Sequence, residues 1–103
     1  METKIKEQNY RIKQMNAIEI LSIQTQIDFE NYNSTKKSYN LILEKVEVQI
    51  KDKWLPVKAE GQEIYYPANV ENDLETIQAI IKFFMNYFKS VFQKSDELKE
   101  ITE

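Results

Sequence analysis

The side chains in this 103-residue sequence that could do acid–base chemistry are carboxylates, and they gather in two places. Glu60 and Glu63 flank Gly61, and Glu71 lies two positions before Asp73. Two carboxylates held close together can serve as a general acid and a general base. Near a turn or the start of a helix, however, carboxylates are more often solvated or capping groups. We therefore expect no catalytic residue and predict that the protein is not an enzyme.

The rest of the composition excludes most other reaction chemistry. The sequence has no histidine and no cysteine, which removes imidazole acid–base catalysis, thiol nucleophiles, disulfides and thiolate metal sites. Its single glycine, Gly61, cannot supply a phosphate-binding loop or a dinucleotide-binding pattern, because both need several glycines. No group of carboxylates has the spacing of a calcium-binding loop. We expect neither a metal site nor a cofactor.

Composition and charge indicate an ordinary soluble domain. The sequence is 42% hydrophobic and 30% charged with a formal net charge of −3, which suits one domain with one core. The basic residues Lys4, Lys6, Arg11 and Lys13 are the only hint of nucleic-acid binding, and two acidic neighbours favour a solvated lead-in instead. No apolar run has the length of a membrane span or the character of a signal peptide. We expect a cytoplasmic protein that binds neither nucleic acid nor a membrane.

The residues that interrupt regular structure are confined to one segment. The single glycine and both prolines fall within DKWLPVKAEGQEIYYP, residues 52–67. Just before it, VEVQIK alternates apolar and polar side chains from Val46 onward, which is typical of a half-buried strand. KDK can turn the chain, WLPVK can return it, and EIYYP is rich in strand-forming residues. We predict a short β-hairpin insert over 46–67.

Helical periodicity governs the sequence on both sides of this insert. Two helices are predicted over 13–46, and a long amphipathic helix over 72–94 that Asn72 or Asp73 caps. The expected buried stripes are Tyr39, Ile42, Leu43 and Val46 on the second helix, and Leu74, Ile77, Ile80, Ile81, Phe84, Phe88 and Val91 on the last. The predicted fold is mainly α (α+β), a single domain over 1–103: a basic lead-in (1–12), two N-terminal helices (13–46), a β-hairpin insert (46–67), one long C-terminal helix (72–94) and a frayed acidic tail (95–103).

Aromatic residues in two places are candidates for binding a partner. Phe83 and Tyr87 lie one helical turn apart at the margin of the last helix's apolar stripe, where a partner surface is nearly as plausible as the core. Trp54, Tyr65 and Tyr66 lie in the β insert, where a sheet edge and a rigid aromatic loop could dock another chain. The alternative for both groups is that the rings are buried in the core. A third possibility, in which the last helix lies on a membrane surface, is weakened by the acidic residues at its start.

The order of several short segments resembles a known family. NAIEIL, IDFEN, LILEKVEV, KWLPVK, YYPANVEND, FFMNYF and FQKS, between Met15 and Ser95, are similar to the tail assembly chaperones encoded by long-tailed phages of Gram-positive bacteria. The resemblance implies a helical protein that binds the tape measure protein and the tail tube protein while the tail is built. It also implies a chaperone made in two lengths, the longer by ribosomal frameshifting, and this chain is similar to the short form.

The resemblance and the missing catalytic groups together give the expected function. We expect a non-enzymatic phage tail assembly chaperone that works in the cytoplasm of the host bacterium, with self-association possible. The alternative is a small phage or plasmid protein that binds and regulates or inhibits a host protein. Neither function requires an active site or a cofactor.

Overall fold

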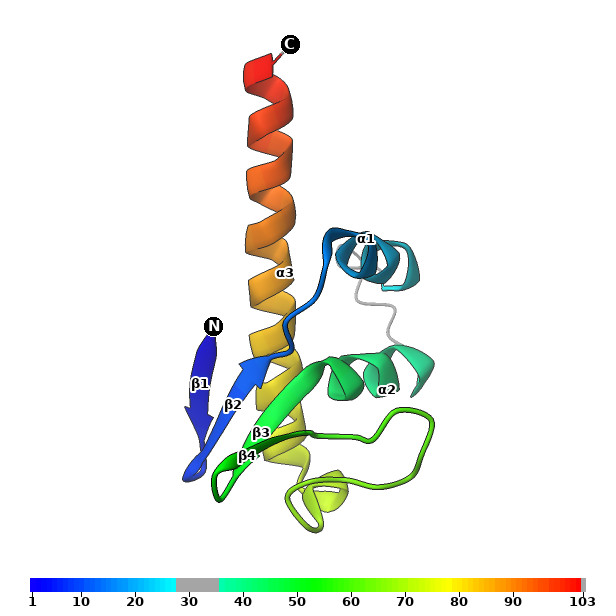
Figure 1. Ribbon diagram of the computed structural model, residues 1–103, viewed down its shortest axis with the longest axis vertical. Coiled ribbons are helices and arrows are strands. Elements are labelled where there is room, and N and C mark those ends of the chain that lie inside the picture. The colour runs from blue at the N-terminus through cyan, green and yellow to red at the C-terminus, as the bar shows by residue number, and fades with distance from the viewer. Residues whose placement is uncertain (28–35, 103) are drawn as a thin grey trace.

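A four-stranded antiparallel sheet forms one layer of the structure, and the helix α3 forms the other (Figure 1). The computed structural model describes residues 1–27 and 36–102, with side chains as far as Val91. In these residues the strands are β1 (Glu2–Ile5), β2 (Gln8–Ile12), β3 (Val46–Ile50) and β4 (Lys53–Pro56), in the spatial order β1-β2-β3-β4. The predicted fold class, mainly α with a β-hairpin insert, is therefore wrong.

The first hairpin occupies the segment that was predicted to be a basic lead-in. Lys6 and Glu7 have φ values of 46° and 70°, so a two-residue turn with two left-handed residues joins β1 to β2. Such turns usually contain asparagine or glycine, so the sequence Lys-Glu gives no turn signal. Tyr10, only 1% exposed, and Ile12 alternate along β2 and face the core. The lead-in prediction is wrong because the period-2 alternation of Tyr10 and Ile12 makes this segment a half-buried strand.

The second hairpin lies where strands were predicted, but it is not an insert. Val46 begins β3 and a turn at Lys51 leads into β4, as the alternation indicated. β3 also pairs with β2 on its other side, with Tyr10 opposite Val48. The third β-prone stretch, EIYYP, forms no strand, and only Tyr65 makes an isolated bridge to Lys58.

Three α-helices in the described residues complete the fold: α1 (Ala17–Gln26), α2 (Lys36–Lys45) and α3 (Leu74–Thr102). The first was expected from residue 13, but Lys13 donates its N–H to the carbonyl oxygen of Lys45 and extends the β2–β3 pairing instead. Asn16 then caps α1 by accepting the N–H of Glu19 at 2.9 Å. The stretch 28–35, part of the predicted helical region 13–46, lies outside the described residues.

The C-terminal helix is the best-predicted element. A single 3₁₀ turn, η1 (Val70–Asn72), precedes it, and Asp73 caps it by accepting the Thr76 N–H at 3.2 Å. The helix continues to Thr102, past its expected end at 94 and through most of the segment predicted to fray, 95–103. Residue 103 lies outside the described residues.

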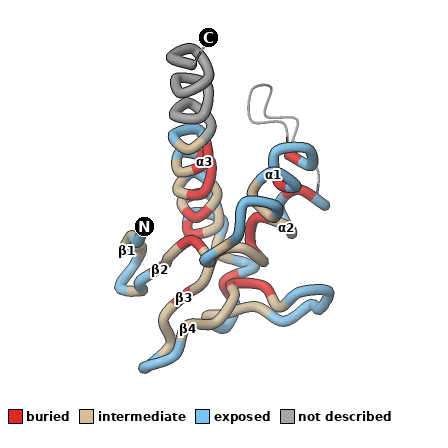
Figure 2. Tube along the Cα trace, turned by 45° about the horizontal axis from the view of Figure 1, so that its top comes forward, coloured by how far each residue is buried: buried red, intermediate tan, exposed pale blue. Residues whose placement is uncertain are grey.

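The core lies between the sheet and α3 (Figure 2). Ile80, Phe84 and Phe88 of α3 are completely buried, and the Phe84 and Phe88 rings lie 4.5 Å apart between centroids. The other buried apolar residues are Tyr10, Ile12, Ile23, Ile27, Ile42, Leu43, Val46, Val48, Val57, Val70 and Met85. Each helix and the two central strands contribute to this cluster, so it joins segments from the whole described chain.

A buried ion pair attaches the loop after β4 to α2. The ammonium of Lys58, a residue only 3% exposed, lies 3.6 Å from a carboxylate oxygen of Glu44. The same Glu44 oxygen accepts the Gly61 N–H at 3.3 Å, and Gly61 has a φ of +71°, which favours glycine. Glu44 and Gly61 thus fix the path of this loop.

The depth of burial on α3 predicts an order of stabilities. Phe84→Ala and Phe88→Ala should each lower the free energy of unfolding by about 3–5 kcal/mol, because each removes a completely buried ring. Phe83→Ala should cost much less, since Phe83 is only partly buried at the edge of the core. Chemical denaturation followed by circular dichroism would measure all three. Equal losses would contradict the assignment of Phe83 to the margin.

Candidate functional site

An exposed apolar groove runs between α2 and α3. Its volume is about 640 Å³, and its lining residues are Tyr39, Leu74, Ile77, Gln78, Ile81, Lys82, Met85 and Asn86. Leu74 is 70% exposed and Tyr39 is 41% exposed, unusual values for large apolar side chains. A concave apolar surface with a few polar groups is typical of a binding site.

The groove exists because the apolar stripe of α3 is wider than the surface that the sheet can cover. Ile80, Phe84 and Phe88 occupy the side that faces the core. Leu74 and Ile81 are spaced so that they lie together on one flank of the helix, next to α2. The apolar periodicity of the sequence predicts Leu74, Ile81 and Tyr39 to be core residues, so the groove was not predicted. The only available signal was the width of the stripe.

The charge within the groove lining is basic, whereas the acidic residues Asp73 and Glu75 flank Leu74 at one end of the groove. Lys82 is the one charged residue among the described lining residues, beside the neutral amides of Gln78 and Asn86. α2, which supplies Tyr39, begins with the exposed residues Lys36 and Lys37. A partner with an apolar stripe and acidic flanking residues would match this surface.

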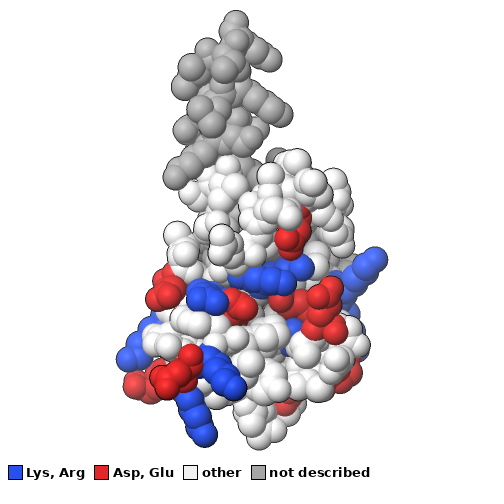
Figure 3. Space-filling model, in the orientation of Figure 1, with Lys and Arg blue, Asp and Glu red and all other residues white. Residues whose placement is uncertain are grey.

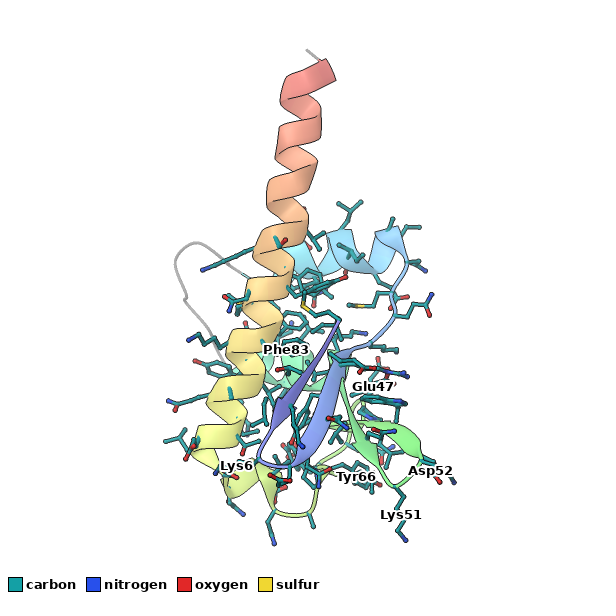
Figure 4. All side chains as sticks on the ribbon, turned by 90° about the vertical axis from the view of Figure 1, so that its left-hand side faces the viewer. Lys6, Glu47, Lys51, Asp52, Tyr66 and Phe83 are labelled. Atoms are coloured by element: carbon teal, nitrogen blue, oxygen red, sulfur yellow. The ribbon has the colours of Figure 1, made fainter. Side chains whose placement is uncertain are left out.

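The predicted binding residues Phe83 and Tyr87 lie on the opposite flank of α3. Both are partly buried against the core, and the Tyr87 ring meets that of Phe88 edge-on with centroids 5.1 Å apart. Figure 4 shows Phe83 between α3 and the β1 side of the sheet. Neither residue lines the groove.

Trp54 lies on the face of the sheet that points away from α3. The guanidinium carbon of Arg11 lies 4.2 Å from the Trp54 ring centroid, and Arg11 Nε donates to a carboxylate oxygen of Glu47 at 2.8 Å. This is a cation–π contact supported by an ion pair. On the face shown in Figure 3, basic and acidic side chains are intermingled over the sheet, without a patch of one sign.

Tyr65 and Tyr66 lie in the loop that follows β4. The Tyr65 hydroxyl donates to a carboxylate oxygen of Glu63 at 2.9 Å. Burial raises the pKa of Tyr65, and the hydrogen bond to Glu63 raises it further. Tyr66 donates its N–H to the carbonyl oxygen of Val57 at 2.8 Å. Both rings pack against the edge of the core. The structure therefore places the five predicted binding residues in three separate locations.

The described residues contain neither a metal-binding cluster nor a membrane-spanning helix. Within 1–27 and 36–102, no cluster of three or more carboxylates could hold a metal ion. No helix in that part of the chain is both long enough and apolar enough to cross a membrane. A further exposed apolar pair, Ile18 and Leu21, lies on α1 and is separate from the groove lining.

Comparison with known proteins gives no identification: no protein family, no curated protein and no solved structure matches the chain significantly.

An ion pair fixes the end of α3 at which the groove begins. Lys6 Nζ, in the β1–β2 turn, lies 3.2 Å from Asp73 Oδ1, and the Thr76 hydroxyl donates to Asp73 Oδ2 at 2.7 Å. The hydrogen bonds from Thr76 lower the pKa of Asp73 most, and the hydrogen bond from Lys6 lowers it further. The hydrogen bond to Asp73 raises the pKa of Lys6. This contact links the first hairpin to the start of α3.

The lowered pKa of Asp73 predicts a loss of stability in acid. Because its folded pKa lies below the unfolded value of roughly 4, the carboxylate stabilises the fold above that pH and ceases to do so as the pH falls through the folded pKa. Asp73→Asn should lower the free energy of unfolding at neutral pH and flatten its dependence on pH in the acid range. Urea denaturation at a series of pH values would measure both effects, with Asp52→Asn in the exposed β3–β4 turn as the control. An unchanged acid slope in Asp73→Asn would contradict the prediction.

Proposed function

We propose that this protein is a non-enzymatic tail assembly chaperone of a long-tailed phage, working in the cytoplasm of the host bacterium. The observation that carries the proposal is the exposed apolar groove between α2 and α3. The resemblance of Met15–Ser95 to such chaperones supplies the proposed partners, the tape measure protein and the tail tube protein. Binding of this kind needs no catalytic group and no cofactor.

The groove suits a helix of the tape measure protein. A long helical chain with apolar stripes would associate with other copies of itself before the tail tube encloses it. An amphipathic helix can lie in an apolar groove and bury its stripe there. Leu74 and Tyr39, which are exposed on the two walls, would contact that stripe, and Lys82 would face its acidic flank.

The lining of the groove also favours reversible binding. Of its large apolar lining residues only Tyr39 and Leu74 are exposed, and Gln78 and Asn86 in the lining are neutral amides. A contact with few anchors can be released when a larger interface competes for the same helix. We infer that closure of the tube around the tape measure protein displaces the chaperone.

The groove predicts which substitutions remove the chaperone activity. The double variant Leu74→Ser/Tyr39→Ser should stay folded, because neither side chain belongs to the buried core cluster. It should bind the tape measure protein roughly thirtyfold more weakly, a loss of about 2 kcal/mol. Co-expression with the tape measure protein of the same phage would measure its soluble yield, and isothermal titration calorimetry would measure the affinity. Ile18→Ser/Leu21→Ser on α1 is the matched control, since it also replaces two exposed apolar residues.

Two results would count against this function. If the unmodified protein neither binds the tape measure protein nor raises its soluble yield, the chaperone proposal is wrong. If Leu74→Ser/Tyr39→Ser keeps full activity while Phe83→Ala/Tyr87→Ala loses it and remains folded, the binding surface is the opposite flank of α3.

A further inference from the structure

The outer edge of β1 carries backbone groups that no other described segment pairs with. β1 lies at one end of the sheet order, with β2 as its single neighbour. Ile5 pairs with Gln8 across the two-residue turn, and Ile12 donates its N–H to the carbonyl oxygen of Met1 at 3.3 Å. In an antiparallel ladder every second residue bonds to the same neighbour, so Met1, Thr3 and Ile5 bond to β2. The N–H and C=O groups of Glu2 and Lys4 therefore point away from the sheet.

This edge is accessible to another strand. Glu2 and Lys4 are exposed, and the ion pair that Lys4 makes with Glu7 is a long contact of 3.9 Å between largely exposed side chains. Figure 4 views the molecule from this side, with β1 in front of the rest of the sheet. Unpaired strand edges are templates for strand addition, and natural proteins commonly protect them with charged residues.

The charges on this edge are complementary to themselves. We propose that a second copy of the chain pairs with β1 in antiparallel orientation, about a twofold axis at Thr3, and so joins two four-stranded sheets into one. In this register Glu2 of each copy lies directly opposite Lys4 of the other, and these two residues exchange the backbone hydrogen bonds that point outward. Each pair also brings a carboxylate beside an ammonium on one face of the sheet.

The alternative registers are less favourable because they bring like charges together. A shift that places Glu2 opposite Glu2 of the second copy, or Lys4 opposite Lys4, still aligns the outward-pointing backbone groups. Like charges directly opposite one another destabilise a strand pair. The Thr3-centred register is thus the one that both aligns the outward-pointing backbone groups and places opposite charges next to each other.

The flank of α3 beside this edge supplies apolar surface to the same interface. Phe83 is partly buried and lies between α3 and the β1 side of the sheet (Figure 4). A twofold axis perpendicular to the sheet keeps both α3 helices on one face and turns their Phe83 flanks toward each other. The α2–α3 groove lies on the other flank and stays open, so this inference does not depend on the proposed chaperone function.

A charge-exchange series tests the dimer directly. Sedimentation equilibrium of the untagged chain at low salt should show a reversible monomer–dimer equilibrium. Glu2→Lys and Lys4→Glu should each raise the dissociation constant at least about tenfold, because each places like charges opposite one another twice in the dimer. The double variant Glu2→Lys/Lys4→Glu should return it to within about threefold of the original value, since it restores opposite charges. Lys51→Glu, in the exposed turn between β3 and β4, is the control and should change little.

A backbone variant separates strand pairing from charge alone. Lys4→Pro removes an N–H that points outward and leaves the Thr3 and Ile5 bonds to β2 in place, so it should abolish the dimer without unfolding the chain. Circular dichroism melts of every variant would verify the fold. A chain that stays monomeric at the highest concentrations measured would overturn the proposal. So would a dimer whose dissociation constant is unchanged in Glu2→Lys, Lys4→Glu and Lys4→Pro.

Discussion

The pairing of β2 with β3 is the interaction on which the rest of the structure depends. It joins the first hairpin to a strand that follows both N-terminal helices, with Tyr10 opposite Val48 and Ile12 opposite Val46. A two-stranded hairpin is marginally stable alone, whereas four strands with one apolar face can support a helix. The four paired side chains belong to the same buried cluster as Phe84 and Phe88. Without this contact, neither hairpin nor α3 would have a complete apolar partner.

The same arrangement accounts for the surfaces that remain available to other molecules. The sheet covers the side of α3 that carries Ile80, and the two flanks of the helix extend beyond that cover. One flank, with Leu74, meets α2 and forms the groove proposed to hold a tape measure helix. The other, with Phe83, lies beside the β1 edge proposed to pair with a second copy. A single helix can therefore stabilise the core and contribute to two separate interfaces.

Local patterns in the sequence predicted the individual elements better than their assembly. The Asp73 cap and the alternating strand at Val46 were recognisable because capping chemistry and side-chain period act within a few residues. The first hairpin was missed because Lys6 and Glu7 are not residues that mark a tight turn, and its pairing with β3 is a long-range contact. For the candidate site, the sequence placed Phe83 at the margin of the apolar stripe but assigned Leu74 to the core. Which flank a wide stripe leaves exposed depends on neighbouring elements that periodicity does not specify.

Nuclear Overhauser spectroscopy can test the central claim, the pairing of β2 with β3, without any substitution. Just beyond the ends of β2 and β3, Lys13 donates its N–H to the carbonyl oxygen of Lys45. Hydrogen-bonded and non-hydrogen-bonded pairs alternate along an antiparallel ladder, so Tyr10 and Val48 form a pair that exchanges no hydrogen bonds. In such a pair the Cα atoms approach to about 4.5 Å. Strong cross-peaks are expected between the α-protons of Tyr10 and Val48, and between those of Ile12 and Val46. If these cross-peaks are missing from an assigned spectrum of the folded protein, while those within β3–β4 are present, the four-stranded sheet and both surfaces built on it are contradicted.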